Sequence, residues 1–198
     1  MAKRVPAIRA PLDRARLALT ALEMIDEVGV EGLTMRSVAA RVDVSVMALY
    51  YHVTDKDELL RLVGDVVLGR IELPDPDSGD WRELFTSVTM AVVDALLEIP
   101  GLSPVLLSSK MLPNARQLMR FGIHQLERGG LSSAAAQKVY AGVQTLVLGR
   151  LLIEENASYR VSSTPHPDNE IRDYVATLRS RDSFYEALTA LVDRKVPS

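Results

Sequence analysis

The chain has 198 residues, of which 47% are hydrophobic and 25% charged, with no Cys and a formal net charge of −3. This composition is typical of a globular protein and excludes collagen-like, disulfide-stapled and largely disordered classes, as well as thiolate and Cys-ligated metal chemistry. The amino terminus lacks the apolar segment of a secretory signal, and no stretch approaches the ~20 apolar residues of a spanning helix, so we expect a cytoplasmic protein without membrane contact.

The net charge hides an asymmetry. Residues 1–16 contain five Lys and Arg against one Asp, a charge of +4, which leaves −7 for the remaining chain. A basic arm ahead of an acidic body is typical of a protein whose amino-terminal end meets a polyanion. A solvated, disordered tail would carry the same charges.

The first third of the chain predicts four helices. Apolar residues recur with a period of 3.6, and Ser, Thr or Asp precedes each periodic segment. We expect helices over residues 13–28 (cap Asp13, stop Gly29), 35–42 (cap Thr34), 46–53 (cap Ser45) and 56–71 (cap Thr54 or Asp55).

The rest of the chain also reads as helical. Residues 73–80 hold two Pro, one Gly and three Asp, which predicts a linker. No alternating pattern predicts a strand, so the expected fold is all-α. The later helices are expected over residues 81–99, 114–129 (cap Asn114), 133–158 (cap Ser132 or Ser133) and 170–196, the last as one helix or two.

Residues 34–53 carry the sharpest local signal. Two short helices joined by a three-residue turn are the geometry of a helix-turn-helix, although a generic helical hairpin has similar caps and periodicity. The close crossing of the two helices needs small or branched apolar residues inside, and the second helix needs an outward face for DNA. The first requirement is met by Val38, Ala39, Val42, Val44, Leu49 and Val53, and the outward residues, Val46, Met47, Ala48, Tyr50, Tyr51 and His52, are more apolar than a solvent face needs.

The run GVEGLTMRSVAARVDVSVMALYYHVTDKDELL at residues 29–60 resembles the DNA-binding domain of the TetR family of transcriptional regulators. A weaker resemblance to the tetracycline-repressor branch continues at Trp81, 120–132 and 146–155. The resemblance implies an all-α homodimer, with a helix-turn-helix DNA-binding domain over 1–60 and a helical ligand-binding and dimerisation domain over 61–198. Family members mostly repress transcription until a small ligand releases them from a palindromic operator.

The resemblance also assigns the DNA contacts. Val46, Met47 and Ala48 are expected to enter the major groove, and a helix amino terminus beside Lys56 favours a phosphate. From the residues alone, two alternatives stay open: one of the adjacent tyrosines packs inward, and Lys56 is only a surface lysine. The full set of expected DNA-binding residues is Arg36, Ser45, Val46, Met47, Ala48, Tyr50, Tyr51, His52 and Lys56.

Two positions depart from the family pattern. Asp43 fills a turn position that is usually Gly because it favours a positive φ, which Asp tolerates at some cost. Val46, Met47 and Ala48 replace polar residues that are common in relatives. Apolar side chains cannot hydrogen-bond to base edges, so we expect them to contact thymine methyl groups.

The ligand domain gives a weaker signal. In the tetracycline-binding branch, a His and other polar residues hold the drug and its magnesium, whereas residues 97–113 contain no His and one carboxylate, Glu98. We therefore expect a metal-independent pocket that needs no cofactor and takes an effector that is mostly apolar. The candidate polar pocket residues are Thr86, Thr89, His124 and Gln144. For His124, a partly exposed or hydrogen-bonded position outside the pocket is an equally good interpretation.

Catalysis is not indicated. The sequence has no Gly-rich phosphate loop, no GxSxG elbow and no HExxH motif. The expected function is therefore a sequence-specific, ligand-responsive regulator of transcription, most simply a repressor, and not an enzyme. The alternative is a helical protein-interaction module that does not bind DNA.

A dimer would hold two DNA-binding domains at a fixed spacing. Apolar stripes on 133–158 and 183–196 are expected to build a four-helix bundle between two subunits, unless they pack only inside one subunit. These stripes are Val139, Val143, Leu146, Val147 and Leu151, and Phe184, Leu188, Leu191 and Val192.

Overall fold

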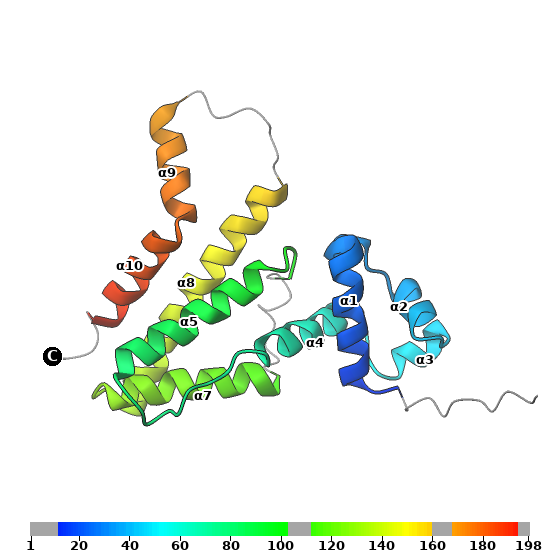
Figure 1. Ribbon diagram of the computed structural model, residues 1–198, viewed down its shortest axis with the longest axis horizontal. Coiled ribbons are helices and arrows are strands. Elements are labelled where there is room, and N and C mark those ends of the chain that lie inside the picture. Colours follow the sequence, from blue (N-terminus) through cyan, green and yellow to red (C-terminus); the bar gives the residue numbers. More distant parts are fainter. Residues whose placement is uncertain (1–11, 103–111, 160–167, 194–198) are drawn as a thin grey trace, which may run out of the picture.

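The computed structural model describes residues 12–102, 112–159 and 168–193, and within them it contains helices and no strand (Figure 1). This confirms the expected all-α fold class. None of the helices in these ranges has both the length and the apolar content to cross a membrane. The basic residues Lys3, Arg4 and Arg9 lie outside the described ranges. In chain order the helices are α1 (Arg14–Gly32), α2 (Met35–Arg41), α3 (Val46–Tyr50), α4 (Lys56–Leu68), α5 (Trp81–Leu97), α7 (Pro113–Arg128), α8 (Ser133–Tyr159), α9 (Asn169–Arg179) and α10 (Arg181–Asp193).

The first four helices begin where their caps predict. The side chains of Asp13, Thr34, Ser45 and Asp55 each accept a hydrogen bond from the backbone N–H three residues further on. At α2 the contact is reciprocal, because the Ser37 hydroxyl also reaches the Thr34 backbone N–H, which makes a capping box. Each cap contributes about 1 kcal/mol to helix stability. The amino-terminal domain is therefore specified helix by helix.

Two features differ from the sequence expectation, and a third decides an alternative that the sequence left open. Gly29, with φ 72° and ψ 169°, kinks the first helix instead of ending it, and one more turn follows. Asn114 is not the cap of α7; it hydrogen-bonds to Asp65 on α4. The carboxy-terminal segment forms two helices, which are separated at Ser180 by an extended backbone conformation.

Two apolar clusters form the core. One joins α1–α4, where Leu17, Leu49 and Leu59 are fully buried, and continues into the body, where Leu102 after α5 is also fully buried. The other lies between α5, α7, α8 and α10. Figure 1 shows α4 reaching from the head, formed by α1–α3, to the bundle of α5, α7 and α8. Helix α4 is thus the structural connection between head and body.

The apolar stripes expected at a dimer interface lie mainly in the core of one subunit. Side chains on both long helices are buried, among them Val143 on α8 and Leu188 on α10, which are 2% and 0% exposed. The reason is that α10 packs against α8 and α5, so these residues fill the space between them. The buried residues of the stripes are thus occupied within one subunit, whereas Leu146 on α8 and Leu191 on α10 are partly exposed.

Candidate nucleic-acid interface and ligand cavity

Helices α2 and α3 form a helix-turn-helix. Val38, Ala39, Leu49 and Val53 are at most 1% exposed, so the expected interior of the motif is confirmed. Asp43 in the turn has φ 58°, the left-handed conformation that favours glycine. Backbone hydrogen bonds on both sides of this residue hold the turn.

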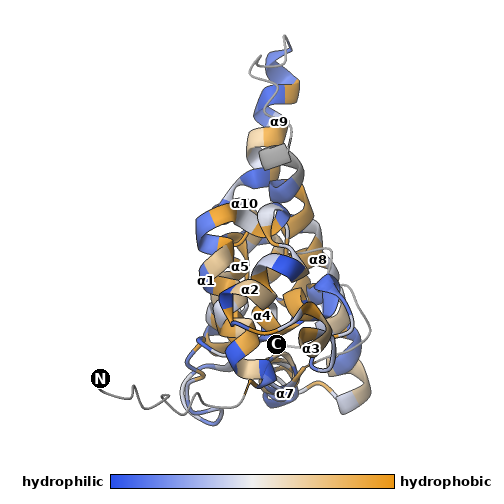
Figure 2. Ribbon diagram, turned by 90° about the vertical axis from the view of Figure 1, so that its right-hand side faces the viewer, coloured by the Kyte–Doolittle hydropathy of each residue, from blue (hydrophilic) through white to orange (hydrophobic). Residues whose placement is uncertain are grey.

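The outer face of α3 is apolar and aromatic. Met47 is 69% exposed and Tyr51 86%, and Tyr50 is also exposed, so neither tyrosine of the pair packs inward. Val46, Ala48 and His52 are partly buried. Figure 2 faces this end of the molecule and shows α3 coloured mostly as apolar. An exposed apolar surface on such a short helix indicates a binding surface.

The other expected DNA-binding residues surround α3. Arg36 is exposed on α2, and Ser45 is exposed at the amino-terminal cap of α3. Lys56 is the first residue of α4 and is partly buried. All nine expected residues therefore lie on α2, α3, the start of α4 or the turns between them.

Two residues that the sequence did not assign to the site fix the end of α3. Arg14 on α1 donates to the backbone oxygen of His52 (2.9 Å) and to the Glu58 carboxylate (2.5 Å). Glu58 also accepts from the backbone N–H of Thr54 (2.6 Å). These hydrogen bonds, first the one from Thr54 and then the one from Arg14, lower the pKa of Glu58 to about 2. The spacing of 44 residues between Arg14 and Glu58 gives no local signal, so the sequence could not reveal the pair.

A cavity of about 320 Å³ lies between α4, α5, α7 and α8. Its wall is mostly apolar, with Phe85 and Val88 from α5, Leu118 and Phe121 from α7, and Val147 from α8. This volume and lining are typical of small-molecule sites. Polar groups enter the wall at Arg61, Asp65, Thr89, Tyr140 and Gln144.

The candidate pocket residues fall into two groups. Thr89 and Gln144 line the cavity, whereas Thr86 and His124 are not part of its wall. Thr86 is buried, and its hydroxyl donates to the backbone oxygen of Arg82 (2.7 Å). His124 lies on another face of α7, 2.9 Å from the Asp77 carboxylate. Among the described residues, no group of three His, Asp or Glu side chains is placed to hold a metal ion.

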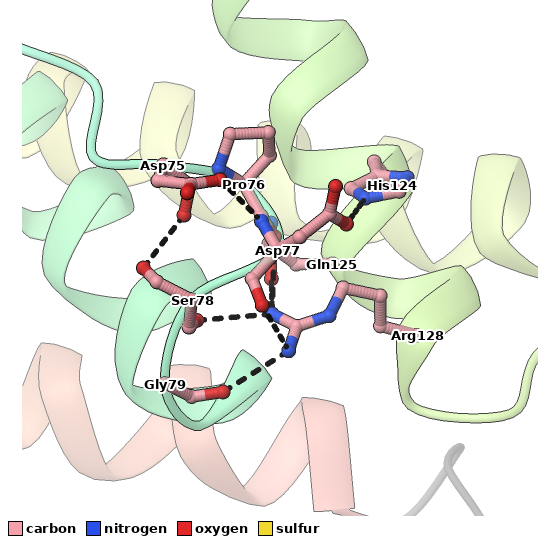
Figure 3. A network of polar contacts seen from close by, with 8 residues as sticks. All are labelled: Asp75, Pro76, Asp77, Ser78, Gly79, His124, Gln125 and Arg128. Carbon is pink, nitrogen blue, oxygen red and sulfur yellow. Dashed lines mark hydrogen bonds and ion pairs between the residues drawn. The ribbon is translucent and has the colours of Figure 1, made fainter.

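The linker is fixed to the carboxyl end of α7 (Figure 3). The fully buried Gln125 donates to the backbone oxygen of Pro76 (2.8 Å). The Arg128 guanidinium donates to the backbone oxygens of Pro76, Ser78 and Gly79, at 3.0 to 3.3 Å. The segment that joins α4 to α5 therefore packs on the helix that forms one wall of the cavity.

The amino terminus of α7 contacts α4. The Asp65 carboxylate accepts hydrogen bonds from the backbone N–H groups of Asn114 and Ala115, both at 3.0 Å. A carboxylate at this position offsets the positive end of the helix dipole. Helix α7 is consequently held to α4 at one end and to the linker at the other.

An exposed helix-turn-helix carried on a helical body with an apolar cavity defines the class of helix-turn-helix transcription regulators. The sequence model described as "Bacterial regulatory proteins, tetR family" matches residues 19–63, which cover α2, α3 and most of α1 and α4. The amino-terminal domain therefore matches the TetR family, and the rest of the chain is similar to TetR family proteins of known structure.

Two curated relatives are named as transcriptional regulators. An HTH-type transcriptional regulator of Saccharopolyspora erythraea is 28% identical over 179 residues, which are 89% of this chain and 73% of that protein. An HTH-type transcriptional repressor of Mycobacterium tuberculosis is 26% identical over 160 residues, 74% of this chain. The chain spans only 61% of the length of that repressor.

Solved structures agree over nearly the whole chain. The Streptomyces coelicolor TetR family protein ActR, in complex with (S)-DNPA, has a TM-score of 0.72 and 27% sequence identity. The match covers 94% of this chain and 98% of that one. The likeness therefore includes the cavity-bearing body as well as the helix-turn-helix.

Proposed function

We propose that the protein is a ligand-responsive repressor that binds a palindromic operator as a homodimer and is released by a small, mostly apolar molecule. Residues 1–60 would read DNA, and residues 61–198 would bind the ligand and dimerise. The observation that carries the proposal is the position of α4, which follows the helix-turn-helix directly and also forms one wall of the cavity. A ligand in the cavity thus touches the helix that supports the DNA-reading head.

The outer face of α3 supports a particular mode of DNA recognition. With α3 in the major groove, Met47 and its neighbours present methyl and methylene groups, which favour thymine methyls over polar base edges. Phosphates would be bound by Arg36, Tyr50, Tyr51 and Lys56. Such contacts raise the affinity for DNA of any sequence. Two further DNA contacts would come from Ser45 and His52, which lie at the two ends of α3.

Dimerisation is required by the size of the head. A single short recognition helix contacts too few bases for tight specific binding, so two heads are needed about 34–36 Å apart, one turn of DNA. Helices α8 and α10 are long enough to join two subunits, and their outward faces are available for this. The dimer can adopt conformations that differ in the distance between the two heads. A ligand that binds one of these conformations better than another would change the affinity for DNA.

The ligand side of the proposal is supported by the cavity and by ActR, which was solved with (S)-DNPA and with actinorhodin. The cavity wall is mostly apolar, so we expect burial of apolar surface to supply most of the binding free energy.

Selection of bound sites from random duplex DNA, followed by footprinting on the DNA flanking the gene, tests this function. We expect a two-fold symmetric site and an affinity that falls steeply with salt concentration. The same selection with Met47→Gln should change the preferred base at one position in each half-site. A protein that enriches no sequence and shows no salt-dependent duplex binding would instead be a helical interaction module.

A further inference from the structure

We propose that the effector is an organic anion, a mostly apolar molecule with one acid group that pairs with Arg61 at the α4 side of the cavity. This inference rests on the proposed function and deepens it by naming the chemical class of the ligand. Of the described residues that line the cavity, two are charged, Arg61 and Asp65, and both lie on α4. Any charge on the ligand is therefore recognised at this wall.

Arg61 has a largely buried side chain and no close partner. Its side chain is 18% exposed, and its ion pair is with Asp55, at 4.0 Å, which is beyond hydrogen-bond distance. In the described part of the chain, no fully buried side-chain nitrogen lacks a hydrogen bond, and no hydrogen bond there involves the Arg61 side chain. Its guanidinium nitrogens therefore face space that water or a ligand fills.

Asp65 does not neutralise this arginine. The two residues lie one helical turn apart, yet they form no ion pair within 4.0 Å in the described structure. The Asp65 carboxylate instead accepts two backbone N–H groups at the amino terminus of α7. The Asp65 carboxylate is thus held at the amino terminus of α7, and Arg61, whose ion pair with Asp55 is long at 4.0 Å, is the cation that the described lining residues offer to a ligand.

The opposite wall accommodates the rest of the ligand. Phe85, Phe121 and Val147 offer apolar surface, and burial raises the pKa of Tyr140 to about 12, so this phenol stays neutral. A second acid group would find no further cation among the lining residues that the structure describes and would lose its hydration without compensation. A single acid group on an apolar body is the arrangement that this wall fits.

Two dyes with the same ring system test the inference. 8-Anilinonaphthalene-1-sulfonate carries an acid group, and N-phenyl-1-naphthylamine is its neutral counterpart. The affinity of the protein for each dye is measured by fluorescence titration. We expect the wild type to bind the sulfonate more tightly. Arg61→Gln should weaken sulfonate binding about tenfold or more and leave the amine within about twofold, because a charge-assisted hydrogen bond is lost. Arg61→Lys should restore part of the sulfonate affinity.

Two further variants serve as controls. Arg70→Gln removes an exposed positive charge just after α4, outside the cavity wall, and should leave both dyes unchanged. Val147→Phe fills the cavity and should weaken both. Equal binding of the two dyes by the wild type, a comparison that needs no variant, would overturn the acid-group inference, as would an unchanged sulfonate affinity in Arg61→Gln.

The outcomes also separate the inference from the proposed function. If Val147→Phe weakens both dyes but Arg61→Gln weakens neither, the cavity binds ligands without an acid site, and the repressor proposal stands. If Val147→Phe affects neither dye, the dyes bind elsewhere and the inference is overturned. If the wild type selects no DNA sequence, the proposed function fails whatever the dyes do.

Discussion

Asp65 on α4 and Asn114 on α7 are joined by two hydrogen bonds that run in the same direction. The backbone N–H of Asn114 donates to the Asp65 carboxylate (3.0 Å), and the Asn114 side-chain amide donates to the Asp65 backbone oxygen (2.9 Å). Gly69 permits this approach, because a Cβ there would lie 2.5 Å from the Asn114 amide nitrogen. Both Asp65 and the next residue of α7, Ala115, line the cavity. Under the proposed function, a ligand that displaces α7 would therefore act on α4 through this contact.

Replacing Asp65 with Ala tests the strength of this contact. The amino terminus of α7 would lose the acceptor of two backbone N–H groups, and the loss of a cap typically costs about 1 kcal/mol, up to about 2. We expect the free energy of unfolding, measured in urea, to fall by about 1–2 kcal/mol. Glu72→Ala, at an exposed position after α4, is the matched control. An unchanged stability would mean that the α4–α7 contact contributes nothing.

The amino-terminal domain could be predicted from sequence because its determinants are local. A capping side chain accepts a hydrogen bond from a backbone N–H only three residues further along the chain. The turn between α2 and α3 depends on the positive φ of one residue, Asp43. The contact of Asp65 with α7 and that of Arg14 with Glu58 span 49 and 44 residues, and no periodicity encodes them. The cavity is formed by four helices, so its charged residues on α4 became apparent only when the helices were packed together.

The dimer stripes illustrate the same limit. Periodicity identified Phe184 and Leu188 correctly as one apolar face of a helix. It does not state whether that face meets the same subunit or a second copy, because both environments bury apolar side chains equally well. The packing of α10 on α8 and α5 shows that Phe184 and Leu188 are buried within one subunit.

Glu58 should make stability depend on pH. Its pKa is about 2 in the folded protein and 4.5 without these contacts, so its contribution is fully present above about pH 5.5 and is lost as the pH falls through 4.5 toward 2. Arg14 is half exposed and solvent screens part of the interaction, so we expect Glu58→Gln to cost on the order of 1–2 kcal/mol at pH 7.

The measurement is the difference in unfolding free energy between wild type and Glu58→Gln from pH 7 to pH 3. The difference should shrink steadily below about pH 4.5. A difference that stays constant over this range would contradict the assignment of the low pKa to Glu58. A weaker operator affinity in Arg14→Ala would further connect this contact to the position of α3.

Lys56→Ala tests the expected phosphate contact at the start of α4. A lysine that binds only phosphate adds affinity for every sequence, so the variant should weaken operator and random duplex alike and lower the salt slope by about one. Lys138→Ala, an exposed lysine on α8, is the control and should leave both affinities unchanged. Loss of operator binding with unchanged random binding would instead place Lys56 on a base.

The last prediction concerns the dimer interface. Phe184 and Leu188 are committed to the core of one subunit, whereas Tyr185 between them points outward and is 46% exposed. A large aromatic side chain on the outward face of α10 is the kind of residue that a two-fold interface buries. A charge at this position would be desolvated next to its own symmetry copy, which disfavours association.

We therefore expect Tyr185→Glu to sediment as a 21.8 kDa monomer at about micromolar concentration, where the wild type sediments as a dimer. Its operator affinity should fall about tenfold or more, because the second head is no longer held beside the first. Leu19→Glu on α1 adds the same charge at a side chain that is 47% exposed and should leave the dimer intact. Circular dichroism establishes that both variants are folded. A dimeric Tyr185→Glu would place the interface elsewhere, and a folded monomer that binds the operator as tightly as wild type would refute the need for two heads.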